Sequence, residues 1–153
     1  SKMNLQQAKA LAISLLRQHD LWPDWSFHFD RSKVRFGTCN YTRRRISLSR
    51  HLVALNGESQ VRDTILHEIA HALAPRGAGH GPAWRKVAIS IGCTGERCYG
   101  AEVARPVPRY RGTCPTCGRE VRRHRRAVLA CGNCTSVYDS RHRLIWSEAA
   151  LAD

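Results

Sequence analysis

No apolar stretch of the sequence approaches the length of about 18 residues that a membrane-spanning helix needs. The first residues, Ser1 to Met3, also lack the basic and then apolar layout of a secretory signal. We therefore expect a soluble protein with no membrane partner. Its expected location is the cytoplasm or the nucleoid, or the nucleus if the source is eukaryotic.

Acidic residues are scarce compared with basic ones. The 153 residues include 12 Asp and Glu but 25 Lys and Arg, which gives a formal net charge of +13 and a pI of about 10.2. An excess of this size goes beyond what solubility requires and favours a polyanionic partner, with nucleic acid as the leading choice. A solvated basic surface and an acidic protein partner are the alternatives.

Disulfide bonds are not expected, although the sequence has seven cysteines. The number is odd, and two Cys-x-x-Cys pairs, Cys114/Cys117 and Cys131/Cys134, are typical of metal binding in a reducing compartment. Four thiolates can complete a tetrahedral zinc shell and leave no position for water, so this zinc would be structural. We expect a small β zinc ribbon in which the segment between the two pairs forms a hairpin.

The spacing of apolar residues indicates an α+β fold. Apolar residues at helical spacing follow a possible N-cap at Asn4, whereas residues 25–49 alternate between apolar and polar as half-buried strands do. The expected elements are a helix over 4–19, strands over 25–30, 34–41 and 45–49, and helices over 58–74 and 82–91. We expect the three strands to form an antiparallel sheet, and residues 105–112 to form an extended linker.

The second expected helix carries two histidines four residues apart in the pattern His-Glu-x-x-His. His67 and His71 can therefore bind one metal ion from the same helix face, and Glu68 beside them can transfer a proton. A catalytic zinc needs a third protein ligand and one open position for water. His80, which follows a Gly-rich turn, is the preferred third ligand, and Glu96 is the alternative. The non-functional interpretation is that His67 is only a buried core histidine.

Two motifs and the Cys-rich segment after them resemble the SprT-like (Spartan-type) metalloprotease family. The motifs are His67-Glu68-Ile69-Ala70-His71 and Gly79-His80-Gly81-Pro82-Ala83-Trp84, and the resemblance covers residues 5–140. It implies a minimal zincin-like fold with a catalytic zinc on His67, His71 and His80, and with Glu68 activating a zinc-bound water. It further implies a DNA-dependent zinc metalloendopeptidase that degrades proteins crosslinked to DNA, with single-stranded or partly single-stranded DNA as a partner.

These expectations divide the chain into four parts and predict two zinc ions, one catalytic and one structural. The parts are a SprT-like zincin domain over 4–104, a linker over 105–112, a four-cysteine zinc ribbon over 113–140 and a C-terminal tail over 141–153.

Two arginine clusters are candidates for contact with DNA phosphates, since guanidinium groups match phosphate in charge and geometry. One cluster comprises Arg122, Arg123, Arg125 and Arg126, and the other comprises Arg43, Arg44 and Arg45. A solvated face or an exposed hairpin tip is the alternative. Further residues with open roles are Tyr110, Tyr138 and Trp146, which could stack on bases or pack against the ribbon. Cys39 has no assigned role, and we interpret Cys93 and Cys98 as buried or free thiols.

Two other functions stay open at this point. A DNA-binding or regulatory zinc-ribbon protein would use its histidines to hold a purely structural metal, but such a site needs no general base, and Glu68 therefore favours an enzyme. A peptidase on soluble proteins would use its basic surface for another anionic partner. Net charge alone does not distinguish a peptidase on soluble proteins from a DNA-dependent one.

Overall fold

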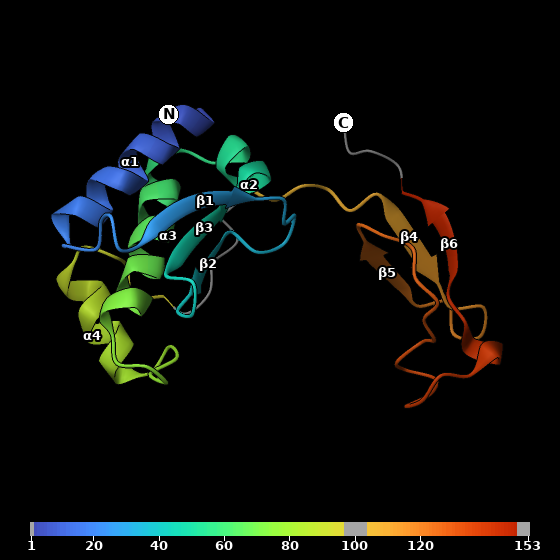
Figure 1. Ribbon diagram of the computed structural model, residues 1–153. Helices are drawn as coiled ribbons and strands as arrows, with labels where there is room; N and C mark the ends of the chain where they lie inside the picture. The colour runs from blue at the N-terminus through green and yellow to red at the C-terminus, as the bar shows by residue number, and fades with distance from the viewer. Residues whose placement is uncertain (1, 97–103, 150–153) are drawn as a thin grey trace. The chain divides into compact units, whose positions relative to one another are not determined.

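The computed structural model describes residues 2–96 and 104–149, which form two compact units (Figure 1). Unit 1 spans Ser1–Pro106 and unit 2 spans Val107–Asp153. Within the described residues, no helix is long and apolar enough to cross a membrane. Each unit has a core of its own.

Unit 1 begins with helix α1, Leu5–Gln18, which confirms the helix predicted over 4–19. Its first turn is closed by a reciprocal capping box. The backbone N–H of Gln7 donates to Oδ1 of Asn4 over 2.7 Å, and the backbone N–H of Asn4 donates to Oε1 of Gln7 over 3.0 Å. The buried face of α1 consists of Ala8, Ala12, Leu15 and Leu16.

The sheet of unit 1 has three strands, β1 (Ser26–Asp30), β2 (Gly37–Asn40) and β3 (Arg45–Ser49), in the order β1-β3-β2. The pair β2–β3 is antiparallel, but β1 and β3 are parallel, so the prediction of an antiparallel sheet is wrong for that pair. The alternation of apolar and polar residues identifies strands but not their directions. After β1, residues 31–36 lead to β2, which does not pair with β1. The β2–β3 hairpin then places β3 between β1 and β2, and β3 runs in the same direction as β1.

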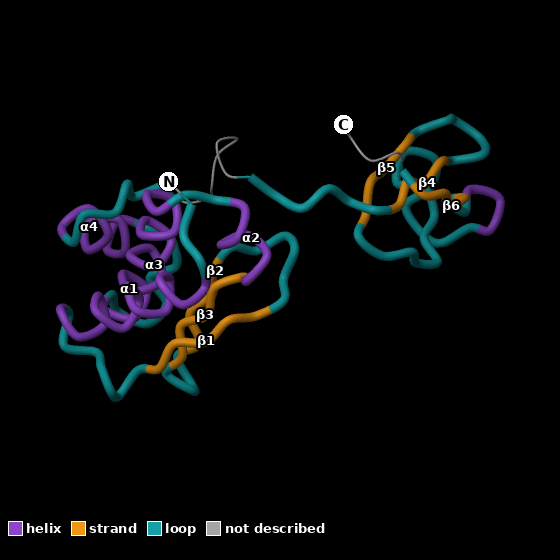
Figure 2. Tube along the Cα trace, turned by 90° about the horizontal axis from the view of Figure 1, so that it is seen from above, coloured by secondary structure: helices purple, strands orange, loops and turns teal. Residues whose placement is uncertain are grey.

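Helices α1 and α3 (Glu58–Leu73) cover one face of this sheet, and α4 (Pro82–Ser90) packs against α3 (Figure 2). The short helix α2 (Arg50–Leu55), which the sequence did not predict, follows β3 directly. The side chain of Ser49 caps it by accepting a hydrogen bond from the backbone N–H of Leu52 over 3.1 Å. The largest fully buried side chains of this core include Trp84, Phe36, Leu16, Ile46, Leu48, Leu52, Ile65 and Ile69.

Unit 2 contains an antiparallel sheet of β4 (Tyr110–Thr113), β5 (Glu120–Arg123) and β6 (Ile145–Glu148) in the order β5-β4-β6. Two expected boundaries therefore move, because the segment 105–112 supplies most of β4 and the segment 141–153 supplies β6. The expected hairpin between the cysteine pairs is also corrected. Strand β5 pairs with β4 across the first cysteine pair, so that pair occupies the hairpin turn.

The core of unit 2 is small. Cys114, Cys131 and Leu144 are buried, and Trp146 packs beside them. The indole lies flat against β4, where a Cβ atom on Gly112 would come within 2.9 Å of its ring, and its Nε1 donates to the carbonyl of Ala127 over 2.7 Å. Trp146 is therefore a packing residue of the ribbon. A core with so few apolar contacts gives little stability by itself, which favours an additional cross-link such as a bound metal ion.

Candidate metal centre

Three imidazole rings converge at the end of α3. The Nε2 atom of His80 lies 3.1 Å from Nε2 of His67 and 3.1 Å from Nε2 of His71. Tetrahedral zinc with Zn–N bonds of about 2.0–2.1 Å separates its nitrogen ligands by about 3.3 Å, which is close to both distances. The three histidines predicted from the sequence are thus brought together in a geometry that fits one zinc ion.

A glycine-rich loop returns the chain from α3 to the metal position. Gly77 and Gly79 have φ angles of 84° and 55°, which side chains rarely adopt. Two tight turns follow, in which Ala78 N–H donates to the Pro75 carbonyl over 3.1 Å and Gly81 N–H donates to the Ala78 carbonyl over 2.9 Å. The loop therefore reverses direction within a few residues and presents the imidazole of His80 to α3.

Trp84 packs against the rings of all three histidines. It is fully buried, and its ring centroid lies 4.6, 5.2 and 4.9 Å from those of His67, His71 and His80. Its Nε1 also donates to the backbone carbonyl of His67 over 3.3 Å. A single rigid side chain from α4 thus restricts the orientations of all three imidazoles, as is common around metal ligands.

His67 and His71 are held as neutral imidazoles. Burial lowers the pKa of His67 to about 4, with further lowering by the charges of His71 and His80. Burial and the charge of His80 likewise lower the pKa of His71 to about 4. Because metal ligation requires the deprotonated ring nitrogen, both rings are ready to bind near neutral pH.

Glu68 is a buried carboxyl group next to this cluster. Glu68 is only 4% exposed, and this burial raises the pKa of its carboxyl group to about 8. The positive charge of Arg35 acts in the opposite direction and lowers that pKa. Strand β2 makes room for it at Gly37. A Cβ atom there would lie 3.0 Å from Oε2 of Glu68, so any larger residue would displace the carboxyl group.

A cavity of about 530 Å³ opens in front of Glu68 and His71. Its other walls are Arg35, Thr38, Cys39 and Tyr41 from the β1–β3 region and Gly77 and Gly79 from the loop. We call it the metal cavity. A site with three protein ligands, an adjacent carboxyl group and open space is what a catalytic zinc needs, whereas a structural zinc site is closed.

Tyr41 is a residue of this site that the sequence analysis missed. Its hydroxyl donates to the backbone carbonyl of His71 over 2.5 Å, where the last carbonyls of α3 have no helical partner. The guanidinium group of Arg76 lies over its ring at 5.7 Å. Tyr41 therefore contacts both the helix end that carries His71 and the loop that carries His80. In the sequence, Tyr41 is marked only as an aromatic residue with a hydroxyl group at the end of a strand. Such residues are too common to identify a site.

The second predicted zinc site is also brought together. The Sγ atoms of Cys114 and Cys134 lie 3.8 Å apart, and those of Cys117 and Cys131 lie 3.7 Å apart. Zn–S bonds of about 2.3 Å place tetrahedral sulfur ligands about 3.8 Å apart. Backbone N–H groups of Cys117 and Thr116 lower the pKa of the Cys114 thiol to about 6, which favours the thiolate that zinc binds.

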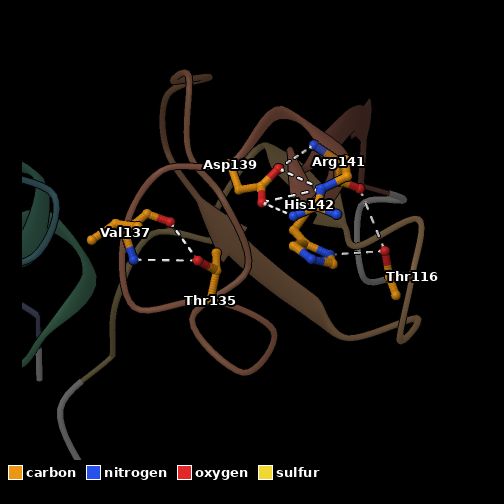
Figure 3. A network of polar contacts seen from close by, with 6 residues as sticks. All are labelled: Thr116, Thr135, Val137, Asp139, Arg141 and His142. Atoms are coloured by element: carbon orange, nitrogen blue, oxygen red, sulfur yellow. Dashed lines mark hydrogen bonds and ion pairs between the residues drawn. The ribbon is translucent and has the colours of Figure 1, made fainter.

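Polar contacts in unit 2 join the first cysteine loop to the short helix Ser140–His142 (Figure 3). Oγ1 of Thr116, in the first loop, lies 2.9 Å from Nδ1 of His142, and the backbone carbonyl of His142 accepts from the N–H of Cys131 over 2.9 Å. Asp139 caps the short helix Ser140–His142, which follows both cysteine pairs, by accepting from the backbone N–H of Arg141 over 2.9 Å. His142 therefore serves the framework of the ribbon, and the candidate ligands there are the four cysteines.

The candidate DNA-contact residues lie on the surfaces of both units. Arg43 and Arg44 are exposed at the β2–β3 turn, whereas Arg45 is half-buried on β3. In unit 2, Arg122 and Arg123 are exposed on β5, and Arg125 and Arg126 are exposed after it. Among the aromatic candidates, Tyr138 is 54% exposed, whereas Tyr110 has the guanidinium groups of Arg109 and Arg126 over its ring at 5.4 and 4.9 Å.

The remaining candidates lie outside the metal cluster. Glu96 is exposed and is not part of the His67, His71 and His80 group. Cys93 is buried with its thiol 3.7 Å from the Asp63 carbonyl, Cys39 is half-buried in the wall of the metal cavity, and Cys98 lies outside the described residues. Burial raises the pKa of the Cys39 thiol to about 12, so it is not a thiolate nucleophile at neutral pH.

The fold and the site define a small α+β domain with a His-Glu-x-x-His metal centre, of the kind found in metallopeptidases. The SprT-like family model matches residues 6–105, which is most of unit 1 and more than half of the 153 residues. The chain therefore belongs to the SprT-like family, a family of zinc metallopeptidase-like proteins. A search among curated proteins gives no match.

Proposed function

We propose that the protein is a DNA-dependent zinc metalloendopeptidase that degrades proteins crosslinked to DNA. The observation that carries the peptidase part is the position of Glu68, which is buried beside three convergent imidazoles and faces the metal cavity. A purely structural metal site gives no reason to bury a carboxyl group at a cost in free energy. Family membership supports the same chemistry.

Glu68 is the proton-transfer group in this proposal. A zinc ion held by His67, His71 and His80 would polarise the scissile carbonyl and acidify water. The carboxylate of Glu68 accepts a proton from the attacking water and passes it to the leaving amine, as a general base and then a general acid. The environment of Glu68 already holds its pKa near the range where one group can do both.

Strand β2 is the proposed binding edge for the substrate backbone. It lies at the edge of the three-stranded sheet, and its residues Thr38 and Cys39 line the metal cavity. An extended peptide can add to such an edge through main-chain hydrogen bonds, with little dependence on its sequence. This arrangement suits a peptidase whose substrates are defined by attachment to DNA more than by sequence.

The basic surfaces supply the proposed DNA contacts. The net charge of +13 is matched by exposed arginines in both units, at Arg43 and Arg44 and at the cluster formed by Arg122, Arg123, Arg125 and Arg126. Each phosphate contact that is lost should reduce the slope of log affinity against log salt by roughly 0.9 on duplex DNA and roughly 0.7 on single strands. We expect single-stranded or partly single-stranded DNA to be the preferred partner.

The proposal is tested by the cleavage of a basic protein crosslinked to DNA, compared with the same protein free in solution. We expect hydrolysis of the crosslinked form that depends on DNA, is abolished by a chelator and decreases when the four ribbon arginines are replaced by Ala. Equal cleavage of the free protein without DNA would instead indicate a general peptidase. An unchanged salt slope in the four-arginine variant would mean that this cluster is only a solvated face.

A further inference from the structure

A second cavity, of about 360 Å³, shares the lining residue Tyr41 with the metal cavity. Tyr41 lines both cavities, and the helix end contributes His71 to one and the next residue, Ala72, to the other. The loop is divided in the same way, with Gly77 lining the metal cavity and Arg76 lining the second one. The second cavity therefore adjoins the position where a bound peptide would pass the metal.

The second cavity has an apolar floor and a charged rim. Its floor consists of Leu21, Trp25, Ala72 and Ala74, and the ring of Trp25 meets that of Tyr41 edge-on at 6.2 Å. Its rim carries the exposed side chains of Asp20 and Asp24 from the α1–β1 connection, and those of Arg44 and Arg76. Across residues 2–96 and 104–149, no ion pair neutralises any of these four charges.

The apolar floor and the two carboxylates of the rim suit a long, positively charged side chain. A long aliphatic stem fits an apolar floor, and a charged head group at its end can reach the rim, as lysine and arginine side chains do at other apolar surfaces. The two carboxylates of Asp20 and Asp24 can each accept a charge-assisted hydrogen bond from such a head group.

We propose that the second cavity is a substrate subsite that binds a lysine or arginine side chain of the cleaved protein, with Asp20 and Asp24 as its charge partners. This inference rests on the proposed peptidase function and specifies its substrates. Proteins that bind DNA are rich in basic side chains, so the subsite would match the class of substrate that a DNA-directed peptidase meets.

The two arginines of the rim do not reverse this preference. Arg76 lies over the ring of Tyr41 in a cation–π contact, which holds its guanidinium group at the ring but leaves its charge in place. Arg44 belongs to the proposed DNA-contact cluster at the β2–β3 turn, and a bound phosphate would neutralise it. The two carboxylates of Asp20 and Asp24 would then outnumber the one remaining arginine charge on the rim, and the preference for basic side chains should increase when DNA is bound.

The test measures peptide binding to the Glu68→Gln protein loaded with zinc, so that hydrolysis is not needed. Unstructured peptides carry one lysine, norleucine or glutamate, which is moved through successive positions. We expect the lysine peptide to bind about fivefold more tightly than the norleucine peptide at one position, which is the upper end of the range for ion pairs between exposed side chains. The double variant Asp20→Asn/Asp24→Asn, in the same background, should bring this ratio close to one.

A matched control removes two carboxylates elsewhere. Glu58 and Glu96 are exposed and do not line the second cavity, so Glu58→Gln/Glu96→Gln should keep the lysine preference despite the same change in net charge. Tighter binding of glutamate than lysine, equal binding of lysine and norleucine at every position, or loss of the preference in the control would overturn the subsite. If lysine-selective binding is found but the active chain hydrolyses no peptide, the proposed function fails and the subsite stands.

Discussion

A Cβ atom on Gly37 would lie 3.0 Å from Oε2 of Glu68, and the same atom would lie 3.0 Å from Cγ2 of Thr64. Strand β2 therefore packs against α3 so closely that a side chain at this position would force the proposed catalytic carboxyl group, or Thr64, to shift by a few tenths of an ångström. The contact links two elements that are distant in sequence, and it fixes where the carboxyl group of Glu68 can point.

Replacement of Gly37 by Ala tests this contact. We expect Gly37→Ala to lower peptide hydrolysis strongly while zinc content stays unchanged, because Glu68 must move and the three histidines need not. Overpacking should also reduce the free energy of unfolding by about 1–3 kcal/mol. Gly132→Ala is the matched control, since its Cβ atom would only reach ordinary contact distance, 3.5 Å from Nη1 of Arg119. Full activity of Gly37→Ala would show that the close approach does not position Glu68.

Tyr41→Phe removes only the hydroxyl group that bonds the His71 carbonyl. Because that bond holds the helix end that carries a metal ligand, we expect the affinity of the His site for zinc to fall by roughly tenfold, as for other groups that orient metal ligands. Competition against a chromophoric chelator measures this affinity. Tyr138→Phe, which alters an exposed phenol in unit 2, should leave it unchanged. Equal affinities in the two variants would count against a positioning role for Tyr41.

The pKa of Glu68 makes a prediction for the zinc-free protein. The carboxyl group of Glu68 has a pKa of about 8 in the folded state, against 4.5 for the free side chain. Its contribution to the free energy of unfolding is therefore complete below pH 4.5 and is lost as the pH rises towards 8. In Glu68→Gln this loss is absent. The difference in unfolding free energy between the variant and the parent should therefore grow from pH 4.5 to pH 8, by at most about 4 kcal/mol.

Circular dichroism at helical wavelengths measures this difference, since helices α1 to α4 all belong to unit 1. Comparison of the two proteins cancels the opposite effect of His67 and His71, whose lowered pKa values reduce stability as the pH falls. A difference that does not change with pH would mean that Glu68 is not buried as the structure shows.

The two ligand groups predict two zinc ions per chain that can be removed separately. Metal analysis of the intact protein should give about two zinc ions, and Cys114→Ser should lose the ribbon zinc while the His site keeps its own. The ribbon should then lose its structure, because its core is too small to fold without the metal. One zinc ion in the intact protein would contradict the assignment.

Local sequence patterns were sufficient for the parts of the site that lie close together in the chain. The spacing of His67 and His71 follows from one helix turn, and the Gly-rich turn before His80 indicates the reversal that the loop makes. The helix with the Asn4 cap was predicted for the same reason. Each of these features depends on residues a few positions apart.

Contacts between distant segments could not be predicted in this way. Gly37 and Tyr41 meet α3 only because β2 occupies the edge of the sheet next to it, and the direction of β1 relative to β3 depends on how the chain crosses between them. In unit 2, the pairing of β6 with β4 joins residues on either side of both cysteine pairs. Prolines near residue 106 suggested a linker that in fact leads directly into β4.

In the proposed function, Glu68 transfers protons at a zinc ion held by three histidines. This role is tested most directly by measuring zinc content and peptide hydrolysis in the same samples of the parent protein and Glu68→Gln. We expect equal zinc in both proteins, with hydrolysis in the variant reduced by at least about 100-fold, the contribution expected of a general base. Undiminished hydrolysis by a fully zinc-loaded Glu68→Gln protein would contradict this role.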